Sequence, residues 1–294
     1  KYLPDNGFLH LFTKYSGLRE LYFSTSRDGH DWSDAVKLVG MKRDGDTLSG
    51  HYQISGQRDG KVAFFFNWHP NGDVDRRTNI YYLETEDFGH TWKTVDGRRV
   101  TIPVQDVTSL TLVKEYFTAG KNVYIKDMAF DEDGHPIALY LVGDGHQPGP
   151  DNGMKEWRVT YWDGVAWQDH HVAVSDHNYD TGSLFVHGKK WQVVIPTGKP
   201  PQLWAGGGEV VLWTSGNKGR SWKLGKNVTS DSRYNHNYIR KVVNGKPPFE
   251  YFWADGNPNT FSKSELFFGD LKGHVWKLPY NMDESSEKPI KLKK

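Results

Sequence analysis

The sequence predicts an all-β protein, a β-propeller of four-stranded antiparallel blades. Three observations lead to this prediction. A turn closed by tryptophan recurs along the chain, a glycine turn recurs between its copies, and no segment shows the apolar spacing of an amphipathic helix. The composition agrees, because 14% aromatic residues and 31 glycines among 294 residues suit short strands joined by tight turns.

The Trp-closed turn is clearest in TEDFGHTW, residues 85–92. SGNKGRSW (215–222) carries the same residue types at the same offsets, and SRDGHDW (26–32) is one residue shorter. YWDGVAW (161–167) and GDLKGHVW (269–276) are degenerate copies. Their last residues, Trp32, Trp92, Trp167, Trp222 and Trp276, lie 60, 75, 55 and 54 residues apart. We expect these turns to be structural: Asp or Asn caps backbone N–H groups, Gly permits the turn, and Trp packs between blades.

A second series of turns contains Gly7, Gly60, Gly134, Gly188 and Gly245, each between two apolar runs. Combined with the first series, one repeat reads strand, Gly turn, strand, long loop, strand, Trp-closed turn, strand. Four strands per repeat predict propeller blades, and five blades are visible. We place the propeller in residues 1–282 and a polar tail in residues 283–294.

The first blade raises a question of closure. Only KYLPDN precedes its Gly turn, which is short for a full inner strand. Either KPIKLK (288–293) supplies the missing strand and five blades close, or the chain is part of a longer propeller.

Bulk properties exclude several classes of function. Lys and Arg total 37 against 36 Asp and Glu, so charge gives no argument for nucleic acid or an anionic membrane as partner. There is no cysteine, which excludes disulfides and thiolate chemistry, and no apolar run is long enough to span a membrane. We expect a monomer.

Polar residues gather where inner strands are expected to begin, at the funnel of a propeller. The strand starts carry His51, Gln53, Lys126, Asp127, Tyr179, Asp180, His236, Tyr238 and Arg240. The loops expected at the same face carry Arg19, His69, Arg76, Arg77, His146, Trp204, Glu209 and Asp255. Convergent polar groups in a concave place predict a binding site. For any single residue, such as His236 or Asp180, the alternative is a bond to a neighbouring blade.

The Trp-closed turns resemble the Asp boxes, or BNR repeats, of sialidase-like propellers, whose form is Ser-x-Asp-x-Gly-x-Thr-Trp. Other stretches, among them GHYQIS (50–55), RRTNIYYLET (76–85) and NYDTGSL (178–184), are similar to those of bacterial BNR-repeat proteins. Related propellers include the seven-bladed ulvan lyases, which use His, Tyr and Arg. The resemblance implies a secreted or periplasmic enzyme that cleaves an acidic polysaccharide or oligosaccharide.

Three chemistries remain open. For β-elimination we expect His51 as base, Tyr238 as acid or partner base, Arg240 on the substrate carboxylate and Asp127 orienting a neighbour, with His236 as the other candidate base. The predicted substrate-binding residues are Gln53, His69, Arg76, Arg77, Lys126, Tyr179, Asp180, Trp204 and Glu209. Hydrolysis would use a pair among Asp127, Asp180 and Glu209, although the Arg-Ile-Pro motif of sialidases is absent. A non-catalytic glycan-binding propeller would stack sugars on Trp68, Trp204 and Trp253.

We expect no catalytic metal and no required cofactor. The 13 histidines show no zinc spacing. A structural calcium ion held by oxygen atoms of GPDNG (149–153) is compatible with the sequence.

Overall fold

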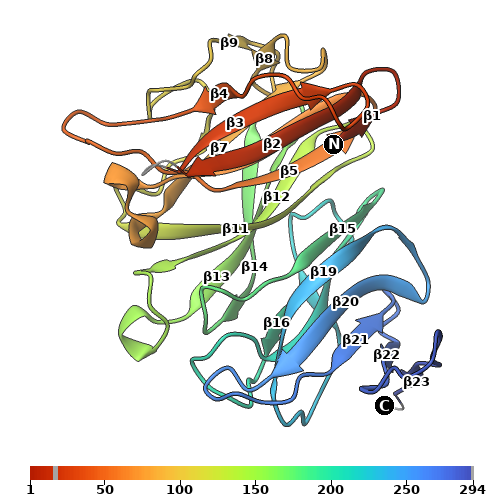
Figure 1. Ribbon diagram of the computed structural model, residues 1–294. Coiled ribbons are helices and arrows are strands. Elements are labelled where there is room, and N and C mark those ends of the chain that lie inside the picture. The colour runs from red at the N-terminus through yellow and green to blue at the C-terminus, as the bar shows by residue number, and fades with distance from the viewer. Residues whose placement is uncertain (16–18, 293–294) are drawn as a thin grey trace. The chain divides into compact units, whose positions relative to one another are not determined.

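A computed structural model describes residues 1–15 and 19–292. Within these residues the regular structure is β-strand, apart from the short 3-10 helices η1 (Pro70–Gly72), η2 (Val74–Arg76) and η3 (Pro150–Asn152). The strands form five antiparallel sheets (Figure 1). The predicted all-β fold of propeller blades is confirmed.

Each sheet is a run of consecutive strands. The first contains β1 (Tyr2–Leu3), β2 (Gly7–Tyr15), β3 (Arg19–Ser26) and β4 (Val36–Val39). The second contains β5 (Gln53–Arg58), β6 (Lys61–Trp68), β7 (Thr78–Thr85), β8 (Trp92–Lys93) and β9 (Arg99–Val100), and β10 (Leu112–Lys114) pairs with β7. The third contains β11 (Lys121–Phe130), β12 (Pro136–Asp144), β13 (Lys155–Trp162) and β14 (Trp167–Ser175).

The fourth sheet contains β15 (Ser183–His187), β16 (Lys190–Gly198), β17 (Glu209–Ser215) and β18 (Lys223–Asn227). The fifth contains β19 (Asn235–Lys246), β20 (Phe249–Gly256), β21 (Leu266–Gly269), β22 (Val275–Lys277) and β23 (Ile290–Lys291). Every Trp-closed turn joins the third and fourth strands of its sheet, as the repeat predicts. The Gly turns join the first and second strands, except that Gly245 lies inside the end of β19.

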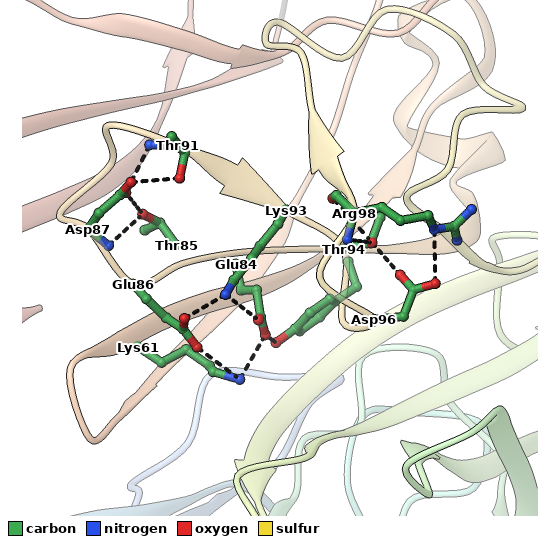
Figure 2. Close-up of polar contacts among 11 residues, drawn as sticks. Lys61, Glu84, Thr85, Glu86, Asp87, Thr91, Lys93, Thr94, Asp96 and Arg98 are labelled. Carbon is green, nitrogen blue, oxygen red and sulfur yellow. Dashed lines mark hydrogen bonds and ion pairs between the residues drawn. The ribbon is translucent and has the colours of Figure 1, made fainter.

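The turn after β7 shows how the motif works (Figure 2). The Asp87 carboxylate accepts the backbone N–H of Thr91 at 2.8 Å and the hydroxyls of Thr91 and Thr85 at 2.6 and 2.8 Å. Gly89 has φ 92°, and a Cβ there would lie 2.5 Å from the Phe23 ring. Trp92 is buried and packs on Phe23, with ring centroids 5.4 Å apart. Asp87 caps the backbone of the turn, Gly89 adopts the positive φ that the turn requires, and Trp92 packs in the core, in agreement with the sequence prediction.

The turn after β17 keeps this geometry with Asn217 in place of aspartate. Its Oδ1 accepts the Ser221 backbone N–H at 3.0 Å, while its Nδ2 donates to the Ser221 hydroxyl at 2.9 Å. The side-chain bond is therefore reversed relative to Asp87 and Thr91, and the turn is unchanged.

The chain divides into two compact units. Unit 1 comprises Lys1–His146 and Thr160–Asp169, and unit 2 comprises Gln147–Val159 and His170–Lys294. Unit 1 contains two apolar clusters, one around Phe64, Phe66 and Trp92, the other around Phe65, Tyr82 and Tyr140. The cluster of unit 2 contains Tyr251, Trp253 and Phe267. These apolar clusters fix the strands in place, and the polar residues described below lie at the ends of those strands.

The C-terminal segment does not complete the first sheet. β23 pairs with β22, with Trp276 opposite Lys291, at the edge of the fifth sheet. The inner strand of the first sheet is β1, only two residues long, which pairs with β2 through Tyr2 and Phe8. The alternative in which KPIKLK fills the first blade is therefore wrong, and Lys293 lies outside the described residues. None of the helices in the described residues is long and apolar enough to span a membrane.

Candidate functional site

Unit 2 contains a cavity of about 650 Å³ that we call the Tyr238 cavity. Its wall is built by the loops before β15 and β17, the start of β19 and the segment from the end of β20 to Ser264. The lining side chains that can transfer protons, hydrogen-bond or stack on a ligand are those of His177, Tyr179, Trp204, Asn237, Tyr238 and Asp255. Tyr179, Trp204, Tyr238 and Asp255 are sequence-predicted site residues that the fold brings together.

Tyr238 occupies an unusual backbone conformation. Its φ is 59°, in the left-handed region that bulky residues seldom adopt, and its side chain is 65% exposed. It lies in a β-bulge: between the pairs Asn237–Ala254 and Arg240–Phe252, β19 has two residues, Tyr238 and Ile239, where β20 has only Trp253. The Asn237 Oδ1 accepts the N–H groups of Tyr238 at 2.8 Å and Thr181 at 2.9 Å. The bulge turns an aromatic ring out of the sheet and into the cavity wall.

Trp204 is held in the same manner, with φ 60°. Its backbone N–H donates to the buried Asp176 carboxylate at 2.5 Å, and Gly207 N–H donates to Asp180 at 2.7 Å. Burial raises the pKa of Asp176. Asp180 is itself fully buried, so its position is that of a support for the Trp204 loop and not of a direct substrate contact. The bond to Gly207 joins two loops of the fourth sheet, so it is not the bond to a neighbouring blade that the sequence offered as an alternative.

His177 lies two residues before Tyr179 in the loop ahead of β15. Its Nδ1 accepts the Tyr179 backbone N–H at 3.0 Å. The neutral ring must therefore carry its proton on Nε2, which makes that atom a donor. The cavity thus combines a polarised imidazole, two phenols and the Asn237 amide with the apolar face of Trp204.

His236 and Glu209 lie behind this wall and are occupied by internal bonds. His236 Nδ1 accepts the Trp253 indole N–H at 3.0 Å, so its Nε2 donates to Ser232 Oγ at 2.9 Å. Ser232 donates in turn to Glu209 at 2.9 Å. Burial lowers the pKa of His236. Both residues thus hold the segment that leads into β19. The roles of His236 in catalysis and of Glu209 in substrate binding stay predictions.

In unit 1, His51 is fully buried and bonded to backbone at both ring nitrogens. Met41 N–H donates to its Nε2 at 3.1 Å, so Nδ1 donates to the Asn67 carbonyl at 2.9 Å. Burial lowers the pKa of His51 to about 4 and that of His69, which bonds Asn67 Oδ1 at 3.1 Å, to about 2. Neither ring can meet a substrate in this arrangement, so the predictions of His51 as base and His69 as substrate contact are wrong.

Arg77 is a buried cation of unit 1 that lies between two aromatic rings. Its guanidinium lies 5.2 Å from the Tyr52 ring centroid and 4.7 Å from that of Tyr124, and its Nε donates to Val74 O at 2.7 Å. Lys126 Nζ lies 5.7 Å from the Tyr124 ring. These residues form an aromatic and cationic cluster in which Arg77 and Lys126 stay predicted substrate contacts.

The remaining predicted residues are more scattered. Asp127 accepts the Met128 N–H at 2.8 Å beside a bulge of β11, Gln53 lies in β5, and Arg76 is exposed in η2. Arg19 lies 5.6 Å from the Tyr15 ring and His146 3.8 Å from Asp75. Arg240 is exposed on β19 and is not among the residues that line the Tyr238 cavity, and its role on the substrate carboxylate stays a prediction. Trp68 and Trp253 are both 1% exposed, which leaves Trp204 to stack on a sugar.

One group of described residues has the geometry of metal ligands. Asp131, Asp133 and His135, in the turn between β11 and β12, offer atoms within 4.8 Å of one another. Asp131 Oδ1 already accepts the N–H groups of Asp133 and His135 at 3.0 and 2.9 Å, which is sufficient to explain the turn. The calcium ion expected at GPDNG stays a prediction.

The sequence profile of a family described as BNR repeat-containing matches residues 6–175, more than half of the chain. This protein belongs to the BNR repeat-containing family. A search among proteins with curated descriptions found no match.

Solved structures of low sequence identity have a fold similar to that of this BNR-repeat protein. An ulvan lyase, bound to a saccharide of GlcA(1-4)Rha3S, superposes with a TM-score of 0.71 at 14% identity; the match covers 91% of this chain and 65% of that one. The unbound ulvan lyase gives the same TM-score at 15% identity. A protein of unknown function from Dyadobacter fermentans gives 0.50 at 13% identity, over 98% of this chain and 74% of its own. The chain thus spans about two thirds of the ulvan lyase's length.

Sequence reasoning missed His177 and Asn237. His177 stands two residues before Tyr179 in HNYD, and Asn237 stands between two predicted residues in HNY. A signal was present for Asn237, since asparagine commonly caps neighbouring backbone N–H groups where the chain departs from regular structure. No signal marked His177, because its place in the cavity depends on loops that meet only in the fold.

Proposed function

We propose that this protein is a carbohydrate-active enzyme that cleaves an acidic polysaccharide by β-elimination, with the Tyr238 cavity as its catalytic site. The observation that carries the proposal is Tyr238, an exposed phenol held at φ 59° in the wall of that cavity. Strained backbone of this kind is characteristic of functional sites. A residue that only covered the surface would gain nothing from it.

The reaction can be written with the groups in the cavity. The Tyr238 oxygen, ionised as a phenolate, takes the proton from the carbon next to the substrate carboxylate. The electron pair forms a double bond to the neighbouring carbon, the bond from that carbon to the glycosidic oxygen breaks, and the departing oxygen takes the proton that the Tyr238 hydroxyl has just received. Deprotonation requires hydrogen-bond donors that stabilise the negative charge which builds up on the carboxylate. Asn237 Nδ2 and the protonated Nε2 of His177 are the donors suited to that role in the Tyr238 cavity.

Hydrolysis fits this cavity less well. A glycosidase needs two carboxyl groups on opposite sides of the bond. Asp255 is the single carboxylate among the residues that line the Tyr238 cavity, and its Oδ1 accepts the Glu265 N–H at 2.7 Å. Asp180 and Glu209 are buried and hold loops. A purely glycan-binding function would use Trp204 without needing the phenols and the imidazole.

The substrate class is suggested by the fold relative. The ulvan lyase was solved with a saccharide that contains glucuronate and sulfated rhamnose. We therefore propose a uronate-containing polymer as substrate and, because such polymers lie outside cells, action as a secreted or periplasmic monomer.

The test compares wild type with Tyr238→Phe and the control Tyr280→Phe. Tyr280 is a similarly exposed tyrosine of unit 2, 57% against 65%, and it does not line the cavity. Each protein is incubated with uronate-containing polysaccharides while ultraviolet absorbance of unsaturated products and release of reducing ends are followed. We expect both signals with wild type and Tyr280→Phe, and a loss of at least about a hundredfold with Tyr238→Phe.

Two results would overturn the proposal. Reducing ends without ultraviolet absorbance would establish hydrolysis instead. Binding of the polymers without either signal would establish a glycan-binding propeller.

A further inference from the structure

A second cavity of unit 2, of about 1000 Å³, lies between β18 with its following loop and the strands β21 to β23. We call it the Arg233 cavity. Val228, Phe267 and Val275 form its buried apolar floor. Lys226, Arg233 and Lys291 contribute positive charges to its wall.

These three cations are not neutralised within the fold. Among the described residues, none of them forms an ion pair with a carboxylate. The carboxylates of the same wall are engaged elsewhere: Glu265 pairs with Lys277, whose Nζ lies 3.1 Å from both oxygens, and Asp255 accepts a backbone N–H at 2.7 Å. The wall is therefore suited to an anionic ligand.

Lys226 is held in place and not merely present on the surface. Its aliphatic chain lies against Gly273, where an added Cβ would come within 2.6 Å of Lys226 Cδ. Its ammonium group donates to the Lys272 carbonyl at 3.1 Å, which uses one of its three N–H bonds. The other two bonds remain available to a ligand at a defined position.

The Arg233 cavity adjoins the Tyr238 cavity. Asp255 lines both. Along β19, His236 lines the Arg233 cavity, while its neighbours Asn235 and Asn237 line the Tyr238 cavity. Successive residues of a strand point to opposite faces, so the two cavities lie on opposite faces of β19 and meet at Asp255. A polymer that passes the strand edge at Asp255 reaches both.

We propose that the Arg233 cavity is a second binding site for the same polysaccharide, one that receives an anionic group of a sugar unit distant from the bond that is cleaved. The proposal deepens the proposed function and rests on it. The ligand chemistry is a carboxylate or sulfate on a saccharide, paired with Arg233 and Lys226, while the apolar face of the sugar packs on the floor.

The experiment measures binding by isothermal titration calorimetry in the Tyr238→Phe background, so that the polymer stays intact. The probes are ulvan, ulvan from which sulfate has been removed, and ulvan whose carboxylates have been reduced to alcohols. Arg233→Gln and Lys226→Gln are compared with Lys223→Gln, a control on an exposed lysine of the same strand, β18, that does not line the cavity. Thermal unfolding verifies that each variant is folded.

We expect Arg233→Gln and Lys226→Gln each to weaken ulvan binding about fivefold, from the attraction of one charge pair at contact in water, and the effect to shrink at high salt. Lys223→Gln should bind as its parent does. The modified polymer that shows no difference between parent and variants identifies which anion the cavity receives.

Equal affinities for parent, Arg233→Gln and Lys226→Gln on all three polymers would overturn the proposal. This outcome is distinct from failure of the proposed function, which appears as absent turnover by wild type. Binding through the Arg233 cavity is measured directly and does not depend on turnover.

Discussion

The Asn237 side chain accepts the backbone N–H of Tyr238 at 2.8 Å and thereby supports a left-handed tyrosine at the edge of a cavity. The same oxygen accepts the Thr181 N–H, so one amide joins β19 to the segment before β15. The geometry of the proposed catalytic phenol therefore depends on a residue that is itself buried.

Substitutions of Asn237 separate the capping role of its Oδ1 from the proposed donor role of its Nδ2. Asn237→Ala leaves the buried N–H of Thr181 and the partly buried N–H of Tyr238 without this acceptor and should lower the free energy of unfolding by about 1–3 kcal/mol. Asn237→Asp keeps an acceptor for both groups, so it should retain most of the stability while it loses the Nδ2 donor and the activity. Chemical denaturation and turnover assays measure the two effects; equal stability of both variants would contradict the capping role.

Tyr238→Gly should remove activity and yet stabilise the protein. A non-glycine residue in the left-handed region costs roughly 1–2 kcal/mol, part of which glycine recovers despite its greater freedom in the unfolded chain. The exposed ring contributes little burial, so we expect a gain of up to about 1 kcal/mol. Tyr280→Gly, at a position without positive φ, should instead lose about 0.5–1 kcal/mol. Urea titration of both variants tests this; a loss at both positions would mean that Tyr238 is not strained.

Stability should fall in mild acid because of His51. Burial lowers its pKa from 6.5 to about 4, so the folded state binds this proton less readily than the unfolded state. Its contribution is complete above pH 6.5 and decreases as pH falls towards 4, by about 3 kcal/mol in total. Free energies of unfolding measured between these pH values should show the slope in wild type and in the exposed control His30→Gln. In His51→Gln the slope should be smaller; an unchanged slope would assign it to other groups.

Asp87→Asn should hardly change the stability of the protein, whereas Asp87→Ala should lower it. Asn217 occupies the equivalent position in the fourth sheet and caps its turn by reversing one side-chain bond. We expect Asp87→Asn to change stability by less than about 0.5 kcal/mol and Asp87→Ala to cost about 1–2 kcal/mol through its lost bonds. Thermal denaturation compares them; equal losses would show that charge, not capping, matters at Asp87.

Much of the fold can be predicted from the sequence because each repeat contains the residues that its own turns require. Gly89 and Trp92 mark one turn by backbone freedom and by size, and such requirements arise within a few residues of chain. The residues of the candidate site are harder to predict from the sequence. The sequence predicts Tyr179, Trp204 and Tyr238 as site residues from their positions at strand starts and loops, and the fold brings them to one cavity wall. The same signal marks His51 and His69, which are fully buried.

The sequence by itself determined the repeat, the blade type and the turns, since these depend on short-range geometry and on the period of apolar residues. Only the tertiary structure decided which polar residues face a cavity and which bond to backbone. A histidine at a strand start has the same local sequence signal in both cases. Its role is set by segments distant in the chain: Asn67 and Met41 enclose His51, whereas the loops before β15 and β17 bring His177 and Trp204 to the wall with Tyr238.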